Sequence, residues 1–93
     1  ESVSSVRFEC AHGAYSYPYH VIARWVLLPG TEETLEIQTG RDRVVVRGTA
    51  LEPVRDALEA ARLRVLRITP SRYTSARTGT FVSALEITVS TGN

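Results

Sequence analysis

The segment TLEIQTGRDRVVVRG, residues 34–48, carries a clear hairpin pattern within this 93-residue chain. Leu35 and Ile37 alternate with polar residues before a turn that contains Gly and Asp, and Val44 and Val46 follow at alternate positions after it. Two alternating runs joined by such a turn are typical of an antiparallel β-hairpin. The segment therefore predicts two paired strands whose apolar side chains face a hydrophobic core.

The hydrophobic period changes directly after this hairpin. Apolar residues between Leu51 and Ala61 recur at steps of three and four residues, which is the spacing of one helix face. Pro53 suits the first turn of a helix, where its missing N–H is not needed. The TALE run that begins at Thr49 has the form of a capping box. We therefore expect one helix at about residues 50–62.

Alternating hydrophobicity predicts further strands on both sides of this hairpin and helix. The expected order is β-β-β-β-α-β-β, in a single compact α+β domain that covers residues 1–93. Strands that follow each other in sequence usually pair, so we expect a mainly antiparallel sheet, or a small curled, barrel-like sheet, capped by the helix. The further strands are expected in residues 3–10, 20–28, 64–69 and 80–90.

The expected strand at residues 20–28 carries apolar side chains on both faces. Alternation places Trp25 and Leu27 on one face and Ile22, Val26 and Leu28 on the other. A single helix cannot cover both faces of the sheet, so another subunit or domain is expected to cover one of them. This pattern favours a small interaction or assembly module, either homo-oligomeric or part of a larger protein.

A tyrosine-rich segment precedes that strand. Tyr15, Tyr17 and Tyr19 stand at alternate positions, and Pro18 among them cannot donate a hydrogen bond to a sheet, so an edge strand or an extended loop is expected. Tyrosine is enriched where proteins meet, but a row of tyrosines can equally cover the margin of the domain's own core. Both interpretations stay open. The expected partner-binding residues are Tyr15, Tyr17, Tyr19, Ile22 and Val26.

The same segment contains the residues that suggest chemistry. Cys10, His12 and His20 are possible metal ligands, but no C-x-x-C or H-x-x-x-H pair is present. Cys10 and His12 lie two residues apart on an expected strand, as a nucleophile and its base could, yet no third group or oxyanion hole is evident. Cys10 also shares the inward face of Phe8, where free cysteine behaves as a small apolar residue. We expect no enzyme activity, no metal and no cofactor.

The distribution of charged residues suggests an alternative function. All eleven basic side chains are arginine, and residues 60–93 hold five arginines and one acid, a net charge of +4. With Tyr73 among these arginines, the segment Arg62–Arg77 and the exposed tyrosines could bind single-stranded nucleic acid or another anion. The sequence pI of 8.3 is below the value of about 9 that marks strong nucleic-acid binders. The expected nucleic-acid contacts are Arg67, Arg72, Tyr73 and Arg77.

Cysteine content and hydrophobicity bear on the compartment. A single cysteine forms no internal disulfide, which favours a reducing, cytoplasmic location. The longest apolar run, residues 21–28, contains Arg24 and is far shorter than the ~20 residues that a membrane span needs, so no membrane partner is expected. The sequence starts at Glu1 and has no methionine, so we expect its native start to have been removed or to lie upstream.

Overall fold

The computed structural model describes residues 3–68 and 80–89 and confirms an α+β fold made mostly of antiparallel strands. The described chain has one α-helix, α1, and a short 3-10 helix, η1 (Tyr19–Val21). No helix within these residues is long and apolar enough to cross a membrane. The main elements are β1 (Ser5–Cys10), β2 (Gly13–Pro18), β3 (Ile22–Leu28), β4 (Glu33–Thr39), β5 (Asp42–Thr49), α1 (Glu52–Glu59), β6 (Val65–Arg67) and β7 (Phe81–Thr88).

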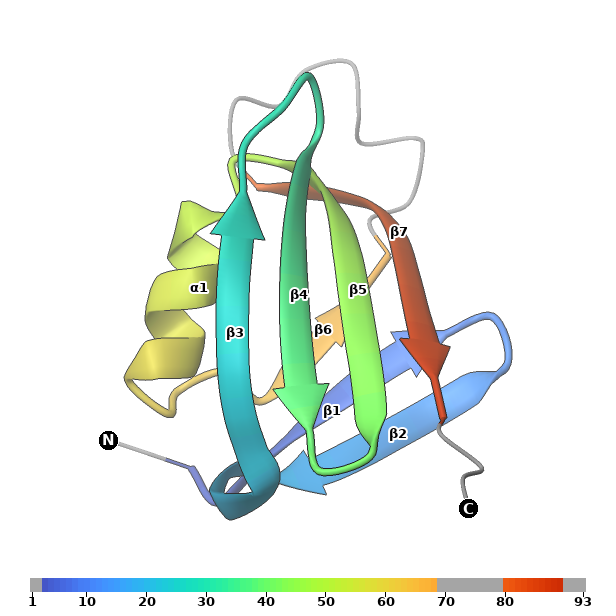
Figure 1. Ribbon diagram of the computed structural model, residues 1–93, viewed down its shortest axis with the longest axis vertical. Helices are drawn as coiled ribbons and strands as arrows, with labels where there is room; N and C mark the ends of the chain where they lie inside the picture. The colour runs from blue at the N-terminus through green and yellow to red at the C-terminus, as the bar shows by residue number, and fades with distance from the viewer. Residues whose placement is uncertain (1–2, 69–79, 90–93) are drawn as a thin grey trace.

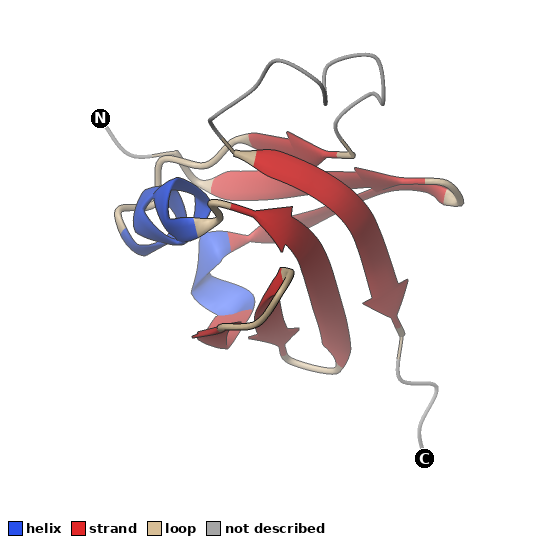
Figure 2. Cartoon of the chain, turned by 90° about the horizontal axis from the view of Figure 1, so that it is seen from above, coloured by secondary structure: helices blue, strands red, loops and turns tan. Residues whose placement is uncertain are grey.

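The strands form two sheets that lie one behind the other (Figure 1). The front sheet has the order β3-β4-β5-β7 and is antiparallel throughout. The rear sheet has the order β2-β1-β6, with β1 antiparallel to β2 and parallel to β6. Seen from above, α1 lies at the side of the two layers next to β3, away from β7 (Figure 2).

The core fills the space between the two sheets and the helix. Its buried side chains come from the inward faces of both sheets, and α1 adds Val54 and Leu58. The predicted β4–β5 hairpin is present, and in it Leu35 lies opposite Val46 and Ile37 opposite Val44. The other buried apolar residues are Val6, Phe8, Leu51, Leu66, Val82 and Leu85.

The helix differs from the sequence prediction at both ends. It spans Glu52–Glu59, and Thr49 is the last residue of β5, so the expected capping box is wrong. Ala50 adopts a left-handed φ of 53°, which turns the chain sharply from the strand into the helix. The carboxylate of Glu33 accepts the Leu51 N–H at 2.7 Å, so a side chain from β4 supplies the contact expected from a local cap.

Two further differences concern the strands. The tyrosine segment forms a regular strand, β2, which the expected order did not include; it lies at an edge of its sheet, as Pro18 favours. A register shift between Ile22 and Arg24 inserts Ala23 as an extra residue in β3. Because of this bulge, Ile22 packs against the core, and its expected place beside Val26 on the outer face is wrong.

Candidate functional site

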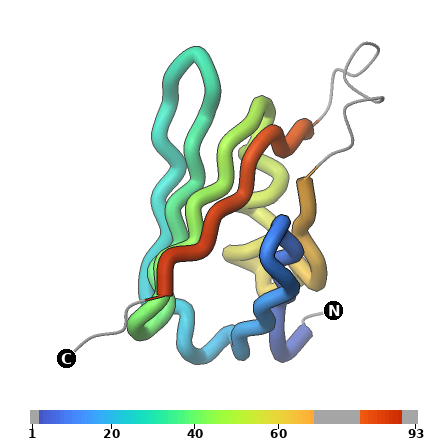
Figure 3. Tube along the Cα trace, turned by 90° about the vertical axis from the view of Figure 1, so that its right-hand side faces the viewer, coloured from blue at the N-terminus to red at the C-terminus, as the bar shows by residue number. Residues whose placement is uncertain are grey.

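A groove lies between the edge strand β7 and the turn that joins β1 to β2. It encloses about 500 Å³ of accessible space, within the range of ligand sites in proteins. Figure 3 views this side of the molecule, with β7 beside the β1–β2 hairpin. The groove is lined by Cys10, Ala11, His12, Tyr15, Ile68 and residues 83–88 of β7.

One wall of the groove is the backbone of an edge strand. β7 pairs with β5 on one side and is the last strand of its sheet, so its other side has no strand partner among the described residues. In such a strand, every second residue directs its N–H and C=O groups away from the sheet. Residues 83–88 thus offer main-chain donors and acceptors along the length of the groove.

The opposite wall is formed by side chains from β1, the turn and β2, and by Ile68 directly after β6. The isoleucine is 39% exposed, and Tyr15, which lines the same groove, is half-buried. Cys10 packs against the core, as expected for a free cysteine. This wall therefore offers an apolar and aromatic surface to anything that lies along β7.

The charge of the groove is distinctive in a chain with eleven arginines. None of the described lining residues is arginine, and Glu86 is the acid among them. Glu86 lies on the outer face of β7, opposite Val45, and makes no ion pair within the described residues. The groove is thus suited to a neutral or basic ligand and disfavours an anionic one.

The structure separates the three tyrosines that the sequence grouped together. Tyr15 lines the groove, whereas Tyr17 and Tyr19 turn toward the protein. The Tyr17 hydroxyl donates to Asp42 at 2.8 Å, and the Tyr19 hydroxyl donates to the Leu63 carbonyl at 2.8 Å. Burial raises the pKa of both phenols, and the bond to the carboxylate raises the pKa of Tyr17 further. These two tyrosines join β2 and η1 to other elements of the fold.

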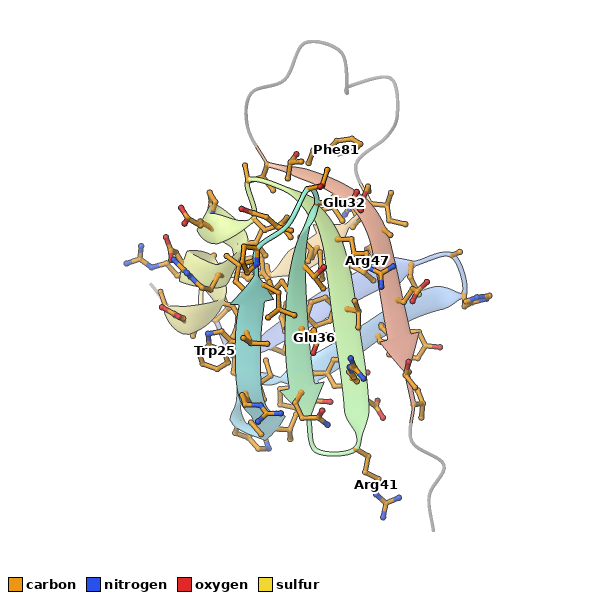
Figure 4. All side chains as sticks on the ribbon, turned by 45° about the horizontal axis from the view of Figure 1, so that its top comes forward. Trp25, Glu32, Glu36, Arg41, Arg47 and Phe81 are labelled. Atoms are coloured by element: carbon orange, nitrogen blue, oxygen red, sulfur yellow. The ribbon has the colours of Figure 1, made fainter. Side chains whose placement is uncertain are left out.

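The other two expected partner-binding residues, Ile22 and Val26, lie on opposite faces of the front sheet. Ile22 belongs to the core side, as described above, whereas Val26 lies on the outer face of the front sheet with Leu28, and both are 41% exposed. Polar side chains share this outer face, among them Glu36 and Arg47 (Figure 4). No described element covers it. It is a second exposed surface, separate from the groove.

The expected nucleic-acid contacts are mostly beyond what the structure describes. Arg72, Tyr73 and Arg77 lie outside the described residues. Arg67 is exposed and binds the Glu9 carboxylate at 3.3 Å. Nucleic-acid binding through these residues stays a prediction, and the inward hydrogen bonds of Tyr17 and Tyr19 remove two of the expected stacking surfaces.

The described residues give no support to a metal or a nucleophilic site. Residues 3–68 and 80–89 contain no group of three or more His, Cys, Asp or Glu side chains that could hold a metal ion. Cys10 and His12 both line the groove, but no hydrogen bond within the described chain joins their side chains. We therefore assign them to the wall of the groove.

Comparisons with known proteins leave the geometry as the basis for function. No protein-family model, no curated protein and no solved structure matches this chain.

Sequence reasoning missed the residues that form most of the groove. The alternation of β7 predicts a strand, but no pattern within it says that it lies at an edge rather than in the centre of its sheet. Ile68 lies directly after β6 and is partly exposed, and the alternation of its segment does not indicate this exposure. The inward alternation of Tyr15 with Tyr17 and the nearby His12 were the available signals for the opposite wall.

Proposed function

We propose that this domain is a non-catalytic protein-interaction module that binds an extended peptide segment in the groove along β7. The observation that carries the proposal is an edge strand that forms one wall of a 500 Å³ groove. An edge strand offers regularly spaced main-chain groups, and an added β-strand is the ligand whose own groups match that spacing. The partner is thus a protein segment in extended conformation.

The side walls predict the pattern of the peptide. Side chains of an added strand alternate between the two faces of the extended sheet. Those that point inward would contact Tyr15 and Ile68, which favours apolar residues at every second position. One that points outward would lie near Glu86, which favours a basic residue.

Peptide selection and mapping test this proposal. A displayed library of short random peptides is selected on the domain, and a bound peptide is titrated into isotope-labelled protein while amide signals are followed by NMR. We expect the largest shifts in residues 83–88 and in the β1–β2 turn, and slower amide exchange on alternate residues of β7. Shifts centred on the outer face of the front sheet would contradict the assignment.

A matched pair of variants localises the binding. Ile68→Glu and Val26→Glu each place a carboxylate where an apolar side chain is about equally exposed, 39% and 41%. Ile68→Glu should weaken peptide binding by about tenfold or more, because an unpaired carboxylate would be buried against the peptide. Val26→Glu should change it by about twofold or less, as expected for a distant surface position. The reverse order of effects would place the interface on the outer face.

Methylation of the peptide backbone distinguishes strand addition from general apolar contact. N-methyl groups on the residues whose N–H groups face β7 remove those donors, so we expect binding to be lost. The same number of N-methyl groups shifted by one residue should leave binding largely intact, because those N–H groups face away. Equal effects of both patterns would overturn the strand-addition mode. A stable dimer that Ile68→Glu dissociates would mean that a second copy of the chain occupies the groove.

A further inference from the structure

A second depression lies on the outer face of the rear sheet and differs from the groove in chemistry. It encloses about 360 Å³ beside the β1–β6 pair. Its described lining contains two arginines and three serines, and no acid or aromatic residue. The lining residues are Val3, Ser4, Ser5, Arg7, Ser16, Arg64 and Val65.

The backbone of the rear sheet fixes these side chains relative to one another. Arg7 lies on the central strand, directly opposite Ser16 of β2 and Val65 of β6. Ser5 precedes it by two residues and therefore shares its face of the sheet. The Arg7 N–H donates to the Arg64 carbonyl at 2.8 Å, which ties the residue before β6 to the same strand.

The charge around the depression is positive. The Nε of Arg7 binds the Glu9 carboxylate at 3.1 Å, and the same carboxylate also binds Arg67. One carboxylate thus neutralises one of these two guanidinium groups, and Arg64 adds another charge that has no ion pair within the described residues. The pair with Glu9 engages Nε of Arg7, and its terminal NH₂ groups have no partner within residues 3–68 and 80–89.

We propose that this depression binds a phosphate group. Guanidinium groups donate paired hydrogen bonds that match the oxygens of a tetrahedral anion, and serine hydroxyls supply further donors. No aromatic residue among the described lining could stack on a nucleobase, so the recognised group is the phosphate itself, as free phosphate or as a small phosphate monoester. This inference is independent of the peptide groove, which is lined by different residues.

Titration with inorganic phosphate tests the site directly. The intact chain is titrated with sodium phosphate at constant ionic strength, while amide signals and arginine Nε signals are followed by NMR; glycerol 1-phosphate serves as the second probe. We expect saturable shifts at Ser5, Ser16 and the Nε of Arg64 with one or both probes, and the tighter probe identifies the free or the esterified anion. Shifts that do not saturate, or that spread over all arginines, would overturn the proposal.

Two charge-matched variants separate a formed site from general attraction. Arg64→Gln should weaken phosphate binding about tenfold, the effect of losing a charge-assisted hydrogen bond. Arg62→Gln removes the same charge from an exposed residue that does not line the depression, and it should change binding by about twofold or less. Urea unfolding of both variants checks that the fold is intact. We expect Arg64→Gln to fold normally, because Arg64 bonds to β1 through its backbone carbonyl and not through its side chain. Equal weakening by both variants would refute the site.

Discussion

At the scale of single residues, Gly48 shows how closely β5 and the edge strand β7 approach each other. It lies in β5 at a register shift between β5 and β7. A Cβ atom at this position would overlap the backbone carbonyl oxygen of Phe81. Glycine is needed here for space, because backbone rather than a flexible side chain occupies the volume.

The first prediction concerns this position. Gly48→Ala should lower the free energy of unfolding by about 3 kcal/mol, because β7 must move away from β5 to admit a methyl group. Urea denaturation followed by circular dichroism measures the change. Gly30→Ala is the comparison. A Cβ atom at Gly30 would lie 3.1 Å from the Glu32 carbonyl oxygen, so this substitution should lower the free energy of unfolding by less. A loss below about 0.5 kcal/mol for Gly48→Ala would contradict the close approach.

Single residues also show where an expectation from local sequence was misleading. Tyr15, Tyr17 and Tyr19 look equivalent in the sequence, yet one lines the groove and two donate hydrogen bonds to other elements. Their acceptors are a carboxylate in β5 and a carbonyl after α1, which are 25 and 44 residues away in sequence. Local periodicity carries no information about partners so distant, so only the orientation of the row could be predicted.

At the scale of elements, the end of the helix carries a strained residue. The Arg62 N–H donates to the Ala57 carbonyl at 2.8 Å and the Ala61 N–H to the Leu58 carbonyl at 3.1 Å, which together form a Schellman motif. Ala61 takes the left-handed position of this motif, with a φ of 55°. Glycine is the usual residue there, because a Cβ atom is unfavourable in that conformation.

Ala61→Gly should therefore stabilise the protein, by about 0.5–1 kcal/mol, since relief of the left-handed strain exceeds the added flexibility of the unfolded chain. Ala57→Gly, inside the same helix, should destabilise it by about 1 kcal/mol. Thermal unfolding of the two variants gives the comparison. If both variants lose stability equally, the alanine is not strained at position 61.

The elements themselves were predicted well where the pattern was long. The β4–β5 hairpin, the helix and the expected strands are all present in the described chain, because each has a clear two-residue or three-to-four-residue period. The helix cap failed, since Glu33 of β4 satisfies the Leu51 N–H from outside the local sequence. The bulge at Ala23 also escaped prediction, and it moves Ile22 to the core side. Such shifts depend on the neighbouring strand, which a single segment does not encode.

At the scale of the whole molecule, Tyr17 joins the two sheets. Its ring lies 6.0 Å from that of Phe8 within the rear sheet, and its hydroxyl donates to Asp42 of the front sheet. The pKa of this phenol is raised in the folded protein, so the folded state keeps its proton at a pH where the unfolded chain releases it. Stability from this bond is complete below the unfolded phenol pKa of about 10 and falls as the pH rises above it.

The corresponding prediction uses alkaline unfolding. The chain contains no lysine, so no ammonium side chain titrates in the same pH range as the tyrosines. The urea concentration at the unfolding midpoint of the wild type should decrease as the pH rises from 9 to 11. This decrease should be smaller in Tyr17→Phe, and the titration of Tyr19 should account for part of the decrease that remains in that variant. Tyr15→Phe is the control, because its hydroxyl makes no hydrogen bond within the described residues. A fall of equal size in Tyr17→Phe and the wild type would refute the link.

The arrangement of the sheets was predicted least well. An α+β fold of mostly antiparallel strands follows from the sequence and is confirmed, but the division into two sheets is not visible in it. The parallel pair of β1 and β6 joins segments that begin at Ser5 and Val65, and neither segment carries a signal for the other. The groove and the depression beside the β1–β6 pair both depend on this arrangement, so neither could be located from the sequence.

The parallel pair also has a consequence for biosynthesis. During translation β2 leaves the ribosome directly after β1, so this hairpin can form early. β6 emerges only after three further strands and α1, and until then β1 has one open edge. Contacts between such distant segments form slowly, and an open strand edge invites association with other chains. The nascent chain is therefore most exposed to aggregation in the interval before β6 is made, when chaperones that shield strand edges would help it most.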